Sequence, residues 1–147
     1  MYQIYIRSFA DADGDGIGDL AGIRSRLGYL ARLGVDGLWL TPCFPSPQHD
    51  HGYDVADFFD IEPTYGTLGD FDELMAEAKA RGLRIMLDVV PNHCSNDHAW
   101  FREAVAAGPS EEHEGQLQLR PARTARQAFP AHHLAALDLH DGLEGGP

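Results

Sequence analysis

Apolar residues in the first part of the chain fall into two kinds of segment. Residues 2–6, 37–41 and 83–90 form short apolar runs, which are typical of strands, and the last run is long enough to suggest a strand covered on both faces. In the two stretches between these runs, apolar residues recur at helical spacing. The resulting order, strand–helix–strand–helix–strand, predicts two right-handed crossover units and a parallel sheet.

Capping residues predict where the two helices begin and end. Asp19 is placed to cap the start of the first helix and Gly34 its end. Thr67 and Asp70 have the spacing of a capping box that opens the second helix, which we expect to end at Gly82. The apolar faces are Leu20, Ile23, Leu27, Leu30 and Leu33 in the first helix, and Leu68, Phe71, Leu74, Met75 and Ala78 in the second.

A sheet of these strands alone cannot close into a barrel, so we expect an exposed edge on each side and a fold that looks unfinished. In βα folds, ligands bind beyond the carboxyl ends of the strands. The loops at those ends are residues 7–19, 42–69 and 91–98, and the unusual residues of the chain lie in them.

The composition changes near residue 108. Residues 109–147 contain one aromatic residue, Phe129, and no Ile, Val, Tyr or Trp, so this segment can bury little apolar surface. We therefore expect this segment to be a poorly ordered tail, with at most a helical turn at residues 134–139. The bias of the tail towards Arg, Ala, His, Pro and Gly suggests an out-of-frame translation of a G+C-rich gene.

Charge and apolar content exclude several classes of partner. The 147 residues carry 11 Lys+Arg against 23 Asp+Glu, and a net charge of −12 repels nucleic acids and anionic lipid surfaces. No apolar run approaches the ~18 residues of a membrane span, and residues 1–4 do not begin a signal peptide. Two cysteines cannot form a disulfide framework. These features predict a soluble protein of the cytoplasm.

The loop after the first strand has the pattern of a calcium site. Oxygen ligands at positions 1, 3 and 5, a glycine at position 6 and a backbone carbonyl at position 7 are typical of calcium loops. The candidate ligands are the carboxylates of Asp11, Asp13, Asp15 and Asp19 and the carbonyl of Ile17. Gly22 stands where an EF-hand needs glutamate, so this is not an EF-hand. The alternative is a solvated acidic turn that caps the following helix.

The loop after the second strand contains a residue pair suited to sugars. Aromatic rings stack on the C–H faces of sugars, and carboxylates accept hydrogen bonds from neighbouring hydroxyls. Tyr53 and Asp50 can supply these two contacts. His49 and His51 flank Asp50, but no further His or Cys has the spacing of a transition-metal site. The alternative is a turn with a core tyrosine.

The third strand ends in a polar pair. Asp88 interrupts an apolar run, and a buried carboxylate needs hydrogen-bonding partners. His93 follows just past the strand end, where ligands bind in βα folds. The alternative is that Asp88 organises the neighbouring loops and that His93 is a hydrogen-bonded loop histidine.

Taken in order, these motifs resemble the N-terminal part of the α-amylase superfamily, glycoside hydrolase family 13, and in particular its α-glucosidase and oligo-1,6-glucosidase branch. The segments that carry the resemblance are residues 2–9, 11–19, 52–55, 65–68 and 88–93. The resemblance implies a barrel part at residues 1–103 and an unmatched, poorly ordered tail at residues 104–147. The resemblance implies an α/β fold that is part of a (β/α)8 TIM barrel. The chain would supply the first three βα units and the start of the insertion that follows the third strand.

The resemblance also implies roles for individual residues. Asp50 would bind the hydroxyls of a terminal glucose, Tyr53 would stack beneath the sugar ring, and His93 would hydrogen-bond to the sugar. Asp88 matches the aspartate of the first family signature and would support the geometry of the site. The acidic loop matches the calcium loop of this branch, so the implied ligands are a structural Ca²⁺ and an α-linked glucose oligosaccharide.

Such enzymes hydrolyse α-glucosidic bonds with retention, using a carboxylate nucleophile and a carboxylic acid. In the family these groups follow the fourth and fifth strands, and no segment of this sequence matches them. We therefore expect the polypeptide alone to be inactive. The alternatives are part of a trehalose synthase or another transglycosylase of the family, and a non-catalytic module that binds calcium and sugar.

Overall fold

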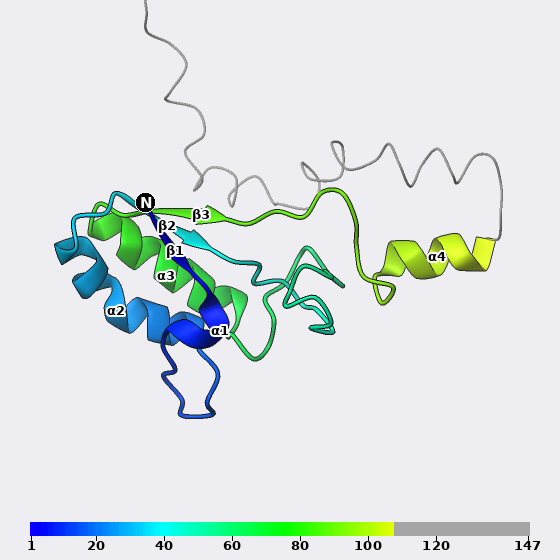
Figure 1. The fold of residues 1–147 in the computed structure, drawn as a ribbon, viewed down its shortest axis with the longest axis horizontal. Coiled ribbons are helices and arrows are strands. Elements are labelled where there is room, and N and C mark those ends of the chain that lie inside the picture. Colours follow the sequence, from blue (N-terminus) through cyan, green and yellow to red (C-terminus); the bar gives the residue numbers. More distant parts are fainter. Residues whose placement is uncertain (108–147) are drawn as a thin grey trace, which may run out of the picture.

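The computed structural model describes residues 1–107 and places three strands and four helices there. The strands form one parallel sheet, and the segments after β2 and β3 extend from it towards α4 (Figure 1). In chain order the elements are β1 (Tyr2–Ile4), α1 (Ile6–Phe9), α2 (Leu20–Arg32), β2 (Gly37–Leu40), α3 (Leu68–Ala80), β3 (Arg84–Leu87) and α4 (Ala99–Ala107).

The sheet has the order β1-β2-β3, and both pairs of neighbouring strands are parallel. Ile4 lies beside Leu40, which in turn lies beside Leu87. α2 and α3 connect successive strands and cover the same face of the sheet (Figure 1). The predicted parallel sheet with helical crossovers is therefore confirmed.

Alternation along the strands separates the two faces of the sheet. Ile85 is 7% exposed and belongs to the main core between sheet and helices, whereas its neighbour Met86 is 41% exposed. Gln3, Trp39 and Met86 form one row across the other face. Successive strand residues point to opposite faces, so this row lies on the face that would point inward in a closed barrel.

The predicted helix caps are present. The Asp19 carboxylate accepts a hydrogen bond from the backbone N–H of Gly22 at 2.5 Å and begins α2. At the start of α3, Thr67 and Asp70 each accept a hydrogen bond from the backbone N–H of the other, at 3.2 and 2.9 Å. Both helices end before a glycine with positive φ, Gly34 or Gly82, which satisfies the last carbonyl groups without strain.

The strands are shorter than the apolar runs predicted. Pairing between β2 and β3 ends with the bond from the Asp88 N–H to the Leu40 carbonyl at 3.1 Å. Beyond it β2 continues into Pro42, which has no N–H to donate to a ladder. Residues 88–90 therefore leave the sheet, and Val90 packs in a second apolar cluster. At the other edge, β1 ends at Ile4, whereas the strand was expected at residues 2–6, and Ile6 begins the one-turn helix α1.

The second cluster contains Phe44, Val55 and Val90 as buried residues, with Tyr53 and Phe58 packed against it. It gives the loops after β2 and β3 a common apolar base. α4 lies beyond these loops, away from the sheet (Figure 1), and its Trp100 ring stacks on Phe58 at 6.0 Å between ring centroids.

α4 extends four residues past the boundary expected at residue 103, so residues 104–107 are helical. The rest of the expected tail, including the turn at residues 134–139, lies outside the described residues. Within residues 1–107, no helix has the length and hydropathy needed to cross a membrane.

Candidate functional site

The loops after β2 and β3 are joined by one hydrogen bond. The Tyr53 hydroxyl donates to Oδ2 of Asp88 at 2.7 Å, across 35 positions of sequence. Asp88 directly follows β3, and both side chains are half-buried. The sequence predicted that Asp88 needs a partner, and Tyr53 is that partner.

The electrostatics of this pair keep Tyr53 protonated. The hydrogen bond to Asp88, burial, and the negative charges of Asp88 and Asp50 raise the pKa of Tyr53 to about 12. The phenol is therefore a neutral hydrogen-bond donor at all physiological pH values. Because the Asp50 charge acts on the Tyr53 hydroxyl, these three residues form one electrostatic group.

Asp50 lies in the tight turn that leads to Tyr53. The Tyr53 N–H donates to the Asp50 carbonyl at 3.0 Å, and the residues between them, His51 and Gly52, have positive φ. The Asp50 side chain is exposed. Tyr53 packs on the second cluster but stays half-buried, so it is not enclosed as a core tyrosine would be.

His93 is exposed and lies five positions after Asp88, in the segment that follows β3. Within residues 1–107 it makes no hydrogen bond or ion pair that would tie it to Tyr53 or Asp50. The structure thus brings together Asp50, Tyr53 and Asp88, and it leaves the role of His93 as a prediction.

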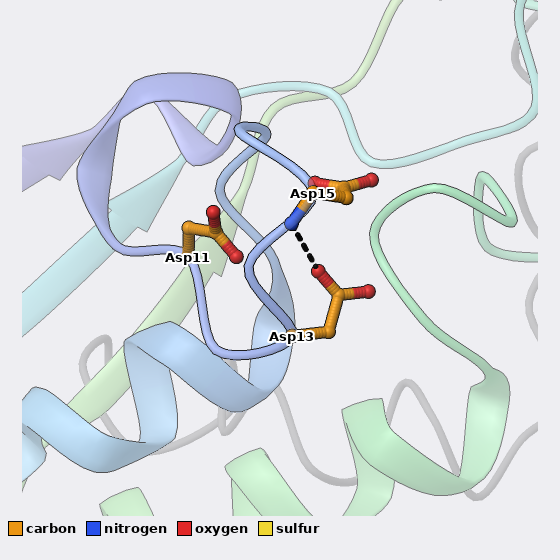
Figure 2. A group of neighbouring side chains, drawn as sticks. All are labelled: Asp11, Asp13 and Asp15. Carbon is orange, nitrogen blue, oxygen red and sulfur yellow. Dashed lines mark hydrogen bonds between the residues drawn. The ribbon is translucent and has the colours of Figure 1, made fainter.

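The acidic loop between α1 and α2 gathers three carboxylates. Oxygens of Asp11, Asp13 and Asp15 lie within 4.8 Å of one another, and all three residues are exposed. Figure 2 shows them on one loop, with the Asp15 N–H donating to Asp13 at 3.0 Å. The loop extends away from the sheet, beyond α1 (Figure 1).

Backbone N–H groups also point at these carboxylates. Asp11 accepts from Gly14 at 2.6 Å and from Gly16 at 2.8 Å, and these bonds lower the pKa of Asp11. The Ile17 N–H donates to the Asp15 carboxylate at 2.7 Å. Hydrogen bonds of this kind hold the loop in a curved form, and at Asp11 they favour the ionised carboxylate.

The remaining predicted carboxylate ligand, Asp19, lies outside this group of three carboxylates. Its side chain is buried, and it accepts hydrogen bonds from the backbone N–H groups of Ala12 at 3.0 Å and Gly22 at 2.5 Å. Asp19 therefore caps the following helix, as the alternative interpretation of the acidic loop predicted.

One residue of the site received no role from the sequence. The Asp54 carboxylate accepts hydrogen bonds from Ser46, His49 and Asp50, and it organises the turn that carries Asp50 and Tyr53. Two of its three donors are backbone N–H groups, which leave no mark in the sequence. The available signals were its position two residues after Gly52 and its place in the segment 52–55, which carries the family resemblance.

Comparison with known proteins gives the family. The model for the alpha-amylase catalytic domain matches residues 3–132. Maltase A2 of Drosophila melanogaster is 58% identical over 105 residues, which are 71% of this chain and 18% of the maltase. Trehalose-6-phosphate hydrolase of Escherichia coli (strain K12) is 61% identical over 105 residues, again 71% of this chain and 19% of the relative.

Solved structures agree with these relatives. Trehalose-6-phosphate hydrolase of Bacillus licheniformis superposes with a TM-score of 0.69 at 50% identity, covering 70% of this chain and 19% of the hydrolase. Trehalulose synthase of Pseudomonas mesoacidophila MX-45 gives 0.69 at 51% identity, covering 70% of this chain and 18% of the synthase.

The chain thus spans about a fifth of the length of the relatives it matches. The order of its elements and the parallel sheet correspond to part of a TIM barrel, as the motifs predicted. The chain belongs to the α-amylase catalytic-domain family of glycoside hydrolases, and its relatives include maltases and other α-glucosidases.

Proposed function

We propose that this chain forms the glucose-holding part of an α-glucosidase-type glycoside hydrolase that acts on short α-linked glucose oligosaccharides. The observation that carries the proposal is the hydrogen bond from Tyr53 to Asp88, with the exposed Asp50 beside it. It joins two loops at the carboxyl ends of parallel strands, where βα folds bind their ligands. The named relatives, a maltase and a trehalose-6-phosphate hydrolase, support this substrate class.

In this proposal each side chain has a separate task. Asp88 fixes the hydroxyl of Tyr53, so the ring has a set orientation and can stack on the C–H face of a glucose unit. The exposed Asp50 carboxylate accepts hydrogen bonds from neighbouring sugar hydroxyls. His93 supplies a further hydrogen bond from the segment after β3.

Bond cleavage needs groups that this sequence does not match. Retaining hydrolysis requires one carboxylate to attack the anomeric carbon and a second carboxyl group to protonate the leaving oxygen. Asp50 and Asp88 are assigned to binding and positioning, and no other segment resembles the family motifs for the reacting pair. We therefore expect the 147-residue polypeptide to bind glucose units without cleaving glycosidic bonds.

The acidic loop fits a structural Ca²⁺ ion. Calcium takes carboxylate and carbonyl oxygens, and Asp11, Asp13 and Asp15 hold such oxygens within 4.8 Å of one another. The Ile17 carbonyl would be a further ligand, whereas the Asp19 carboxylate accepts the Ala12 and Gly22 N–H groups and caps α2. Bound calcium would neutralise the repulsion among these carboxylates and stabilise the loop that leads into α2.

Binding and turnover measured on the same chain test the proposal. We expect maltose to shift amide NMR signals of residues 48–54, and Asp50→Ala and Tyr53→Ala each to weaken binding strongly, so that the shifts appear only at much higher maltose concentration. Asp57→Ala is the control, because within residues 1–107 this exposed carboxylate accepts a hydrogen bond only from the Phe59 N–H, at 2.8 Å. A chromogenic α-glucoside should not be turned over. Turnover that disappears in Asp50→Ala would show that the chain is an active enzyme.

A transglycosylase is the second candidate. Solved structures described as a trehalulose synthase and an α-glucosyl transfer enzyme match this chain at 51% and 50% identity, similar to the match with a hydrolase. The part of the barrel represented here is thus shared by enzymes that differ in acceptor. Binding of maltose by the chain supports both candidates, and only residues that select the acceptor distinguish them.

A further inference from the structure

The loop of residues 46–54 has a backbone that needs external support. Its φ angles are 62° at Gln48, 53° at His51 and 97° at Gly52. Residues other than glycine rarely adopt positive φ, and such positions persist only where surrounding interactions hold them. The loop contains no helix or strand that would provide this support.

The support comes from the Asp54 side chain. Its Oδ1 accepts hydrogen bonds from the Ser46 hydroxyl at 2.6 Å and from the Asp50 N–H at 3.2 Å, and its Oδ2 accepts from the His49 N–H at 2.9 Å. Burial raises the pKa of Asp54, but these hydrogen bonds outweigh it and the pKa is lowered overall. One ionised carboxylate therefore gathers both ends of the turn.

A second layer of bonds ties this arrangement to the rest of the molecule. The Ser46 hydroxyl accepts the Gln48 N–H at 2.9 Å, and the Ser46 N–H donates to Glu62 at 3.1 Å. The Glu62 N–H in turn donates to the Cys43 carbonyl at 2.8 Å. The hydrogen bonds of Asp54 thus connect the turn to the segment that follows β2.

Asp50 and Asp54 differ in what remains available to a ligand. Both oxygens of Asp54 are occupied by donors of its own loop. The exposed Asp50 carboxylate accepts no hydrogen bond within residues 1–107. We propose that Asp54 is the positioning residue of the site: it fixes the Asp50 backbone so that the Asp50 carboxylate and the Tyr53 ring face the same sugar. This inference rests on the proposed function.

The test compares two carboxylates of one segment in the full 147-residue chain. Asp54→Asn removes the acceptor for one of the three donors and the negative charge, whereas Asp57→Asn changes an exposed carboxylate outside the turn. We expect Asp54→Asn to weaken maltose binding about tenfold or more, because a displaced Asp50 carboxylate loses most of its contribution to binding. The amide NMR signals of His49 and Asp50 should shift in this variant. Asp57→Asn should leave binding and both signals unchanged.

A double variant separates positioning from general stability. In the Asp50→Ala background, Asp54→Asn should weaken the residual binding much less than it does alone, because its effect passes through Asp50. Equal weakening in both backgrounds, or binding by Asp54→Asn that matches the parent, overturns the inference and leaves the proposed function intact. A folded parent that does not bind maltose overturns the proposed function and this inference with it.

Ser46→Ala covers the case in which Asp54→Asn does not fold. It removes one donor from Asp54 and the acceptor of the Gln48 N–H, and it keeps the carboxylate charge. We expect binding to weaken about threefold, less than for Asp54→Asn, since a neutral hydrogen-bond donor is lost. Unchanged maltose binding in a folded Ser46→Ala chain also overturns the inference.

Discussion

Tyr53 and Asp88 illustrate how one hydrogen bond can define a site. Tyr53 alone could be the core tyrosine of a turn, and Asp88 alone could organise the neighbouring loops. Their contact links two loops and orients an aromatic ring. The sequence predicted both residues because their chemical types are unusual at strand ends. It could not predict their contact, because 35 positions separate them and only the fold brings them together.

The Tyr53–Asp88 pair predicts an alkaline titration. Tyr53 should ionise at about pH 12, and Asp88→Asn should move its pKa down towards the ordinary value of about 10. Because the folded pKa is raised, the stability from this pair is complete below about pH 10 and is lost as the pH rises through 12. NMR of ring-labelled tyrosine measures the titration.

The control for this titration is Asp36→Asn. Asp36 is exposed, and its backbone carbonyl accepts the Arg84 N–H, an interaction that the substitution keeps. This variant should leave the Tyr53 titration unchanged. A Tyr53 pKa that does not respond to Asp88→Asn would show that the hydrogen bond is absent in solution.

Among the elements, α2 and α3 were predicted well, whereas α1, α4 and the strand ends were not. Helix boundaries depend on local signals, and Asp19, Thr67 and Gly34 act at the predicted positions. Strand boundaries depend on the partner strand. Pro42, which follows β2, ends the pairing between β2 and β3. No property of residues 88–90 themselves shows that the pairing ends there.

Among the loop residues, too, local signals could be predicted and contacts that depend on the fold could not. Asp54 was missed because its partners are mainly backbone N–H groups, whose positions depend on the fold of the turn. Asp19 was predicted as both a cap and a calcium ligand, and the structure places its side chain in the cap.

α2 offers a matched pair of glycines for testing the packing of an element. A Cβ at Gly22 would lie 2.0 Å from the Ala10 carbonyl oxygen, whereas a Cβ at Gly28 would have Arg32 Nη1 as its nearest neighbour at 3.7 Å. We expect Gly22→Ala to destabilise the chain by about 1–3 kcal/mol through steric conflict. Gly28→Ala should stabilise it by about 0.5–1 kcal/mol through helix propensity.

Urea denaturation of the two variants gives the comparison. The opposite signs of the two changes in the free energy of unfolding matter most, because both substitutions add the same methyl group to the same helix. Equal stabilisation by both would mean that α2 does not approach Ala10 as closely as the structure shows. The acidic loop would then not be held against the start of α2.

In the whole molecule, the acidic charge and the open sheet both limit the stability of the fold. The net charge is −12, and the loop that holds Asp11, Asp13 and Asp15 extends into solvent (Figure 1). The row of Gln3, Trp39 and Met86 lies on a sheet face that no helix of the described part covers. Stability must therefore come from the core on the helix-covered face of the sheet, and self-repulsion among the acidic groups opposes it.

Calcium should relieve this repulsion at one place. If the acidic loop binds Ca²⁺, a concentration 100 times the Kd stabilises the folded chain by about 2.7 kcal/mol. Thermal unfolding with and without CaCl2 measures the effect, and Asp13→Asn should remove most of it, because Asp13 contributes one of the three gathered carboxylates. Asp57→Asn, which also removes one negative charge, should keep the stabilisation by calcium.

NaCl at the same ionic strength separates specific binding from screening, which also favours the compact state of an acidic chain. If NaCl raises the melting temperature as much as CaCl2 does, or if Asp13→Asn and Asp57→Asn respond alike, the acidic loop is a solvated turn and the calcium proposal fails.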